Sequence, residues 1–251
     1  MTVTTNADTA GPSAGTVTLS SGASPLDAGA PLTVSFADWT DVSLPLVYDV
    51  LVDGTGVSAP GSSGTVNLTA PLTVGTHTLT GQIYDAFGNL TTVTQNFTVL
   101  TPQQTWRRKN FGITTNTGNA ADTAAPAGDG VANLTKYALG ASPLVSGTTV
   151  LPASSFQTIS GEQYLTLSFT HSLTATDVTC NIDVSGGLSG SWYQGSSYSP
   201  ANGDVPANTY TTQVSRTPSA NGATETIVVR DNVPCSQFVP FRFMRLRVTQ
   251  P

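Results

Sequence analysis

The sequence has few charged residues, and its first hundred residues contain no Lys or Arg. Asp, Glu, Lys and Arg make up 10% of the 251 residues, against about 25% in typical globular domains. The net charge is −6, and every Lys and Arg lies from Arg107 onward. Because nucleic acids and anionic lipid surfaces attract clustered cations, this distribution disfavours both as partners. Arg242, Arg245 and Arg247 are the nearest approach to a basic patch, and we interpret them as a solvated strand face rather than an anion site.

Long apolar segments are also missing. No run of 18 or more apolar residues occurs, so we expect no membrane span. Residues Met1–Thr5 lack the charged and hydrophobic parts of a signal segment. Export to the extracellular space or the cell surface is therefore inferred from the Thr-, Gly- and Ser-rich composition.

Histidine and the common catalytic motifs are scarce. The only two histidines, His77 and His171, each fall inside a predicted strand, where packing or surface roles are expected. The sequence has no Gly-x-Ser-x-Gly elbow, His-Glu-x-x-His helix or phosphate-binding Gly-Lys-Thr loop. A pair of facing carboxylates that includes Glu162 or Glu225 stays open as a glycosidase-type site. We expect no enzymatic activity and name no catalytic residue.

What is abundant favours β structure. Thr and Val are β-branched and fit a pleated surface, and 251 residues are enough for two domains of roughly 100 residues. Leu32, Val34 and Phe36 alternate on one face of a predicted strand, which indicates a two-sheet core. Short strands separated by turn residues predict a β-sandwich over residues 1–101, with strands at Thr16–Ser20, Pro31–Trp39, Leu46–Val52, Thr65–Thr69, Thr76–Tyr84 and Leu90–Leu100.

Three motifs in this first part resemble a known family. Asp8–Pro12, Gly75–Thr80 and Tyr84–Asn89 are similar to segments of the bacterial immunoglobulin-like repeats of surface adhesins. The resemblance covers about 90 residues and implies an immunoglobulin-like sandwich that acts as a spacer or an adhesive unit. It says little about a ligand.

Residues 102–147 interrupt the strand pattern and predict a linker with two short helices around a loop. Leu134, Tyr137 and Ala138 have helical spacing, and Gly140 indicates a helix stop. Residues 148–251 predict a second antiparallel β-sandwich, with strands at Tyr164–Thr170, Val178–Ser185, Thr209–Ser215, Glu225–Val229 and Phe241–Thr249.

This second part is similar to a module found at the C-terminal ends of large exported proteins of Verrucomicrobia-type bacteria. The similarity depends on Trp106 with Phe111-Gly112, on Gly128–Leu134 with Lys136–Gly140, on Leu188 with Trp192, and on Phe243–Val248. It implies location and architecture more than activity.

The resemblance also implies a calcium loop at residues 122–133, of the thrombospondin or dockerin kind. Family members place acidic residues where this sequence has Ala125 and Ala127, so only Asp122, Asp129 and Asn133 remain as candidate ligands. A plain loop in which Asp129 and Asn133 make turn and cap hydrogen bonds is the competing interpretation.

A second candidate Ca²⁺ site lies in the first part. Asp8, Asp85 and Asn89, together with Asp53, could converge as in calcium-rigidified adhesin arrays. The competing interpretation is that each side chain bonds its own turn. We expect no cofactor other than a Ca²⁺ ion at one of these two sites.

Two cysteines and three aromatic residues complete the candidates. Cys180 and Cys235 are expected to form a disulfide in an oxidising compartment, with two free thiols as the alternative. Trp192, Tyr193 and Tyr198 lie in a Gly/Ser-rich stretch where a sugar ring could stack, although Trp192 could instead cap the core of its own module.

The sequence therefore predicts a non-enzymatic structural or adhesive segment of an extracellular bacterial surface protein. Its expected partners are other modules of a larger surface protein or neighbouring copies of itself. The alternatives are a carbohydrate-binding module that recognises glycans and a filament subunit that assembles by edge-strand addition through residues 2–5 and 15–20.

Overall fold

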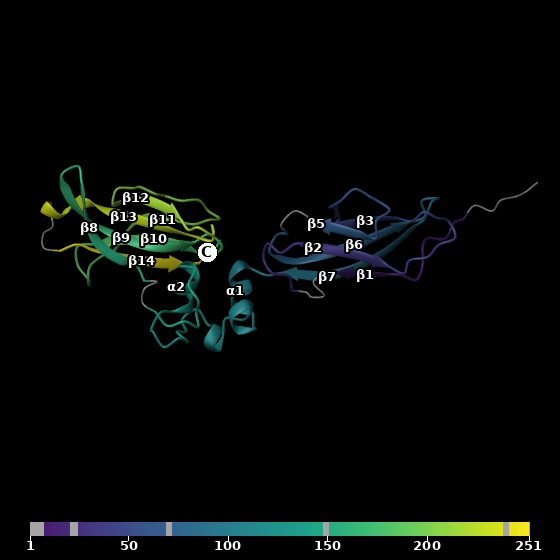
Figure 1. The fold of residues 1–251 in the computed structure, drawn as a ribbon, viewed down its shortest axis with the longest axis horizontal. Coiled ribbons are helices and arrows are strands. Elements are labelled where there is room, and N and C mark those ends of the chain that lie inside the picture. Colours follow the sequence, from purple (N-terminus) through teal and green to yellow (C-terminus); the bar gives the residue numbers. More distant parts are fainter. Residues whose placement is uncertain (1–7, 21–24, 69–71, 148–150, 238–240, 251) are drawn as a thin grey trace, which may run out of the picture. The chain divides into compact units, whose positions relative to one another are not determined.

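The computed structural model describes residues 8–20, 25–68, 72–147, 151–237 and 241–250. The protein is mainly β and divides into two compact units, Met1–Thr101 and Pro102–Pro251 (Figure 1). Among the described residues, no helix is both long and apolar enough to cross a membrane.

The first unit is a sandwich of two antiparallel sheets. One sheet has the order β1-β2-β5 and the other the order β4-β3-β6-β7. Leu32, Val34 and Phe36 on β2 are buried, as predicted from their alternation, and pack in one core with Leu79 and Phe97 of the opposite sheet. The strands are β1 (Thr16–Leu19), β2 (Leu32–Ala37), β3 (Val47–Val52), β4 (Thr55–Gly56), β5 (Thr65–Leu68), β6 (Gly75–Tyr84) and β7 (Leu90–Val99).

The predicted edge strand at residues 15–20 is present as β1, which pairs on one side with β2. The other segment expected to assemble by strand addition, residues 2–5, lies outside the described residues.

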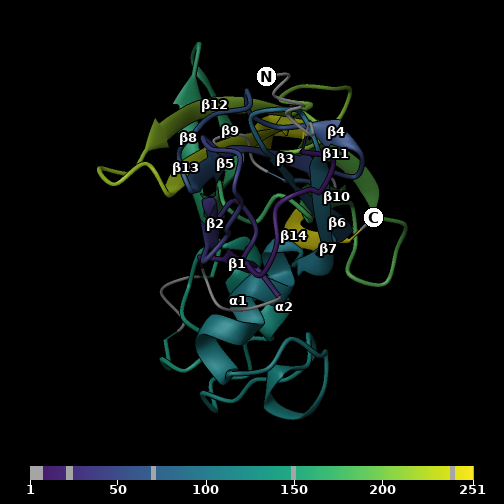
Figure 2. The same ribbon diagram turned by 90° about the vertical axis from the view of Figure 1, so that its right-hand side faces the viewer.

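The second unit begins with helices and continues as another two-sheet sandwich. The helices are α1 (Pro102–Phe111), the 3₁₀ turn η1 (Gly118–Ala120) and α2 (Asn133–Ala138). Figures 1 and 2 show α1, α2 and the loop between them on one side of this unit's strands. Tyr137, Ala138 and Leu139 of this segment join the core of the sheets, and Trp106 and Leu134 pack against it. The helical spacing predicted from the sequence is thus confirmed.

One sheet of this sandwich has the order β12-β13-β9-β8 and the other the order β11-β10-β14. Cys180, Ile182 and Val184 of β10 point into the core, so Asn181 and Asp183 face outward. The strands are β8 (Ala153–Ile159), β9 (Glu162–Ser172), β10 (Thr179–Ser185), β11 (Tyr193–Tyr198), β12 (Thr211–Pro218), β13 (Thr224–Pro234) and β14 (Phe243–Thr249), with a 3₁₀ turn η2 (Cys235–Gln237) before β14.

The aromatic Gly/Ser-rich stretch contains a strand that the sequence did not predict. Residues Tyr193–Tyr198 form β11, which pairs with β10 at the edge of its sheet. This strand requires glycine at position 195. A Cβ there would meet the side chain of Thr211 at 2.3 Å and the carbonyl oxygen of Ile182 at 2.9 Å. Gly195 permits a close approach to β12 that a larger residue would prevent.

Candidate functional site

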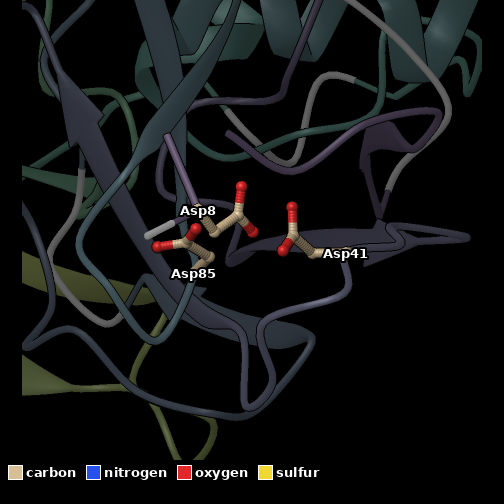
Figure 3. A group of neighbouring side chains, drawn as sticks. All are labelled: Asp8, Asp41 and Asp85. Atoms are coloured by element: carbon tan, nitrogen blue, oxygen red, sulfur yellow. The ribbon is translucent and has the colours of Figure 1, made fainter. Parts of the chain in front are cut away.

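Three aspartates converge in the first unit. One carboxylate oxygen from each of Asp8, Asp41 and Asp85 lies within 4.8 Å of the others (Figure 3). Asp8 precedes β1, Asp41 lies in the loop between β2 and β3, and Asp85 directly follows β6. Within the described ranges, no other group of three or more His, Cys, Asp or Glu side chains comes together in this way.

Hydrogen bonds made by Ser43, in the loop between β2 and β3, hold these carboxylates in place. Ser43 donates its hydroxyl to Asp8 Oδ2 at 2.5 Å and its backbone N–H to Asp41 Oδ1 at 2.7 Å. Its carbonyl oxygen accepts the backbone N–H of Ala86 at 3.0 Å, next to Asp85. Ser43 therefore links all three acidic segments.

Asn89 fixes the third carboxylate. Its Nδ2 donates to Asp85 Oδ2 at 2.7 Å and to the carbonyl oxygen of Asp8 at 3.0 Å. Asp85 Oδ1 also accepts the backbone N–H groups of Phe87 and Asn89, each at 2.8 Å. The sequence prediction thus placed Asp8, Asp85 and Asn89 in one region, and the structure brings them together with Asn89 as a hydrogen-bond donor.

The cluster carries negative charge. The hydrogen bond from Ser43 lowers the pKa of Asp8. For Asp85, burial raises the pKa, but the hydrogen bonds from Asn89 and from the Phe87 N–H outweigh this and leave the pKa lowered. Both carboxyls are therefore ionised at neutral pH, in a unit whose sequence has no Lys or Arg.

The spacing suits a divalent cation. Ca²⁺ binds oxygen ligands at about 2.3–2.6 Å, so two ligands on opposite sides of the ion are about 5 Å apart. The three carboxylate oxygens all lie within 4.8 Å of one another, which is close enough for one ion to contact all three. A hollow of about 440 Å³ opens beside it and is lined by Asp8, Ala10, Gly11, Ser13, Thr40, Asp41 and Val42.

Asp41 is the member of the cluster that sequence reasoning missed, and Asp53 is the residue it included that lies elsewhere. Asp53 Oδ2 bonds Nδ1 of His77 at 2.7 Å, and Nε2 of His77 bonds the carbonyl oxygen of Thr73 at 2.7 Å. Asp41 lies four residues beyond the end of β2, in a loop whose Ser43 bonds the turn that contains Asp85, and this contact is not visible in the sequence.

The second expected calcium loop is occupied by the protein's own cations. Asp129 Oδ2 accepts the ammonium of Lys136 at 2.6 Å, and the side chains of both residues are almost fully buried. This contact lowers the pKa of Asp129 to about 2. Asp122 instead bonds Nη2 of Arg107 at 2.6 Å, and Asn133 Nδ2 donates to the carbonyl oxygens of Asn119 and Ala121. Asp122 and Asp129 thus each pair with a different cation of the chain itself.

The three aromatic residues separate into different environments. Tyr198 is fully buried and packs edge-on against Phe169, so the prediction that it contacts a glycan is wrong. Tyr193 is 49% exposed and stacks on Tyr210 with 5.2 Å between ring centroids. Trp192 is half-buried, with the guanidinium of Arg245 4.1 Å from its ring centroid.

Both cysteines are free thiols, so the expected disulfide is absent from the structure. Cys180 is fully buried on the inner face of β10, and burial raises the pKa of its thiol to about 12. Cys235 is half-buried in η2, a separate segment that follows β13. Of the two alternatives left by the sequence, the structure has the free thiols.

A second polar cluster surrounds His171, one of the two histidines. Its Nδ1 bonds Glu225 Oε1 at 2.8 Å inside the second sandwich, and Glu225 also accepts Nε and Nη2 of Arg216. Asp204 Oδ2 accepts Nη1 of the same arginine. The carboxylate of Glu225 thus contacts His171 and Arg216, and none of these contacts joins it to another carboxylate.

The comparisons with known proteins leave the family open. No family model matches the sequence, and no curated protein matches it. Among solved structures, the chain aligns with carbohydrate-binding modules from the β-sandwich superfamily, described as having promiscuous specificity, at 10% identity and a TM-score of 0.31 over 96% of this chain and 97% of the other. It also aligns with the chitinase ChiA74 from Bacillus thuringiensis at 10% identity and a TM-score of 0.24, over 91% of this chain and 25% of that one. Similarities this low carry no argument about function.

Proposed function

We propose that the chain is a non-catalytic structural or adhesive segment of an extracellular bacterial surface protein, and that its first sandwich binds Ca²⁺ through Asp8, Asp41 and Asp85. The observation that supports this is the convergence of three carboxylates from separate segments, in a unit without Lys or Arg. The resemblance of the first 90 residues to immunoglobulin-like adhesin repeats supports the structural role.

Calcium would act as a rigid link in this proposal. The ion would join the segment before β1 to the loops after β2 and β6, so that the incoming chain is fixed to the sandwich. Such a link would add to the hydrogen bonds of Ser43 and Asn89, because each ligand comes from a different segment of the backbone.

The test is thermal unfolding in Ca²⁺ and in chelator. With a Kd of about 0.1–1 mM, as in extracellular modules, 10 mM Ca²⁺ stabilises the native state by about 1.4–2.7 kcal/mol. For a domain of about 100 residues this raises Tm by about 6–20 °C. We expect the shift in the first unit only.

A matched pair of variants controls for charge. Asp41→Asn removes one proposed ligand and should abolish most of the shift, whereas Asp38→Asn removes the same charge from an exposed residue of the same loop and should keep it. Equal Tm values in Ca²⁺ and chelator for the unmodified chain would overturn the calcium part of the proposal.

A second candidate function is carbohydrate binding by the second unit. The observation that favours it is the exposed, stacked pair Tyr193 and Tyr210. Exposed aromatic faces give sugar rings a surface on which to stack. Tyr193→Ala should reduce retention on immobilised polysaccharides, whereas Phe156→Ala, which removes a 61% exposed aromatic ring from β8 in the other sheet, should not. Equal retention of both variants would exclude the tyrosine pair as the site.

A further inference from the structure

The outward face of the β11-β10-β14 sheet carries two arginines around one buried carboxylate. Asp183 of β10 pairs in register with Arg245 of β14 and Gln194 of β11, and Arg247 lies two residues further along β14. Because Ile182 and Val184 face the core, these four side chains share the outer face. We call these four side chains and that of Trp192 the arginine face.

Asp183 holds both guanidinium groups. Its Oδ2 accepts Nε and Nη2 of Arg245, both at 3.1 Å, and Nε of Arg247 at 2.8 Å. Its Oδ1 accepts Nη2 of Arg247 at 3.1 Å. Asp183 is almost fully buried, whereas the side chains of Arg245 and Arg247 are 44% and 37% exposed. One negative charge is therefore covered by two positive charges that reach solvent.

Donors remain available on both arginines. A guanidinium has five N–H groups, and in the part of the chain that the structure describes, Nη1 of neither arginine has a protein acceptor. A carboxylate or a sulfate binds such N–H groups in the plane of the guanidinium.

Two further contacts orient the arginine side chains before any ligand binds. The ring of Trp192 covers one face of the Arg245 guanidinium, and Gln194 Oε1 accepts Nη2 of Arg247 at 3.4 Å. Stacking on an aromatic ring orients a guanidinium but leaves its N–H edge open. Preorganised side chains lose less conformational entropy on binding, which favours affinity.

We propose that the arginine face binds acidic polysaccharides, that is, glycan chains that carry carboxylate or sulfate groups. Arg245 and Arg247 contact the anionic group, and Trp192 and Gln194 line the surface beside it. The proposal rests on carbohydrate binding by the second unit and names a class of sugar, but it places that sugar on the arginine face rather than on the Tyr193–Tyr210 pair. It replaces the interpretation of Arg245 and Arg247 as part of a merely solvated strand face.

The test uses the full chain in chelator, so that calcium cannot bridge a polyanion to the aspartates of the first unit. Binding is measured by affinity electrophoresis against polygalacturonate, which carries carboxylates, dextran sulfate, which carries sulfates, and neutral dextran. We expect retardation by at least one of the two acidic polymers, weakening with added salt, and none by dextran.

Three variants separate the arginine face from general charge. Arg245→Gln should weaken binding about tenfold, the effect of losing one charge-assisted hydrogen bond. Arg230→Gln is the matched control, because Arg230 also stacks on an aromatic ring, that of Tyr164 at 4.4 Å, but lies in the other sheet. Asp183→Asn removes the competing carboxylate and should strengthen binding, a gain that loss of folding cannot produce.

Each outcome decides the proposal. Loss in Arg245→Gln with retention in Arg230→Gln, or a gain in Asp183→Asn, supports it. Equal binding of neutral and acidic polymers overturns the acidic specificity but keeps carbohydrate binding. Binding to none of the three polymers overturns the proposal, and failure to bind a wider panel of neutral glycans would overturn carbohydrate binding as well. Concentration-dependent association of the chain that Arg245→Gln abolishes would assign the arginine face to a second copy instead.

Discussion

Replacing Gly195 with Ala should destabilise the second unit, because β11 approaches β12 more closely than any side chain allows. An alanine Cβ would lie 2.3 Å from Oγ1 and 2.6 Å from Cγ2 of Thr211. Thr211 is fully buried and its Oγ1 accepts the backbone N–H of Ser196 at 2.5 Å, so it cannot rotate away without losing that bond. The carbonyl oxygen of Ile182, 2.9 Å from the added Cβ, blocks the other direction.

The size of the effect follows from two costs. Overpacking a close-packed site costs about 1–3 kcal/mol, and the hydrogen bond that Thr211 would lose adds about 1 kcal/mol. The sum, about 2–4 kcal/mol, corresponds to a decrease in Tm of about 4–16 °C for a unit of about 150 residues.

The assay is calorimetry or urea unfolding of Gly195→Ala beside Gly187→Ala. Gly187 lies just before the same stretch, and a Cβ added there meets no atom within 4 Å. Its substitution should therefore change stability by less than about 0.5 kcal/mol. Equal and small effects at both positions would refute the reasoning, because they would mean that the stretch containing Gly195 is a loop free to move away from Thr211.

Three further predictions concern the other polar groups. Both ring nitrogens of His77 lie 2.7 Å from oxygens, so the protonated ring can donate both of its N–H groups, and the hydrogen bond with Asp53 raises the pKa of His77. The contribution of His77 to stability is complete below the unfolded pKa of about 6.5 and is lost as the pH rises through the higher folded pKa. The Tm of the first unit should therefore decrease as the pH rises above about 6.5, and a His77→Gln variant with the same decrease would contradict this. Thiol titration of the native chain should detect only half-buried Cys235, and both thiols after unfolding, because Cys180 is fully buried. The absence of any reactive thiol both before and after unfolding would show a disulfide instead. Lys136→Ala leaves a buried carboxylate without its cation and should lower the urea midpoint of the second unit equally in Ca²⁺ and in chelator; a midpoint restored by Ca²⁺ would show that the loop is a calcium site after all.

The fold could be predicted from the sequence wherever burial imposes a period. Leu32, Val34 and Phe36 alternate and are buried on one face of β2, and the spacing of Leu134 and Tyr137 gives α2. The three strands that were missed, β4, β8 and β11, lack this signal. Both residues of β4 are exposed, and four residues of β8 in succession are exposed. β11 buries Gly195, Ser196 and Tyr198, which do not alternate regularly with exposed residues.

The candidate sites were less predictable because they depend on contacts between distant segments. The motifs around Asp8 and Asp85 indicated one region, but Asp41 joins it only through the hydrogen bonds of Ser43. Lys136 was assigned to a family motif, and nothing in the sequence indicates that its ammonium neutralises Asp129. The alternation of β14 was visible, whereas the pairing of its arginines with Asp183 requires the strand register.

Isothermal titration of Ca²⁺ into the chelator-treated chain tests the central claim most directly. The account predicts one ion bound per chain with a Kd of about 0.1–1 mM, and loss of this binding in Asp85→Asn but not in Asp38→Asn. The absence of any binding heat and of any Ca²⁺-dependent change in Tm, or binding that persists unchanged in Asp85→Asn, would contradict it.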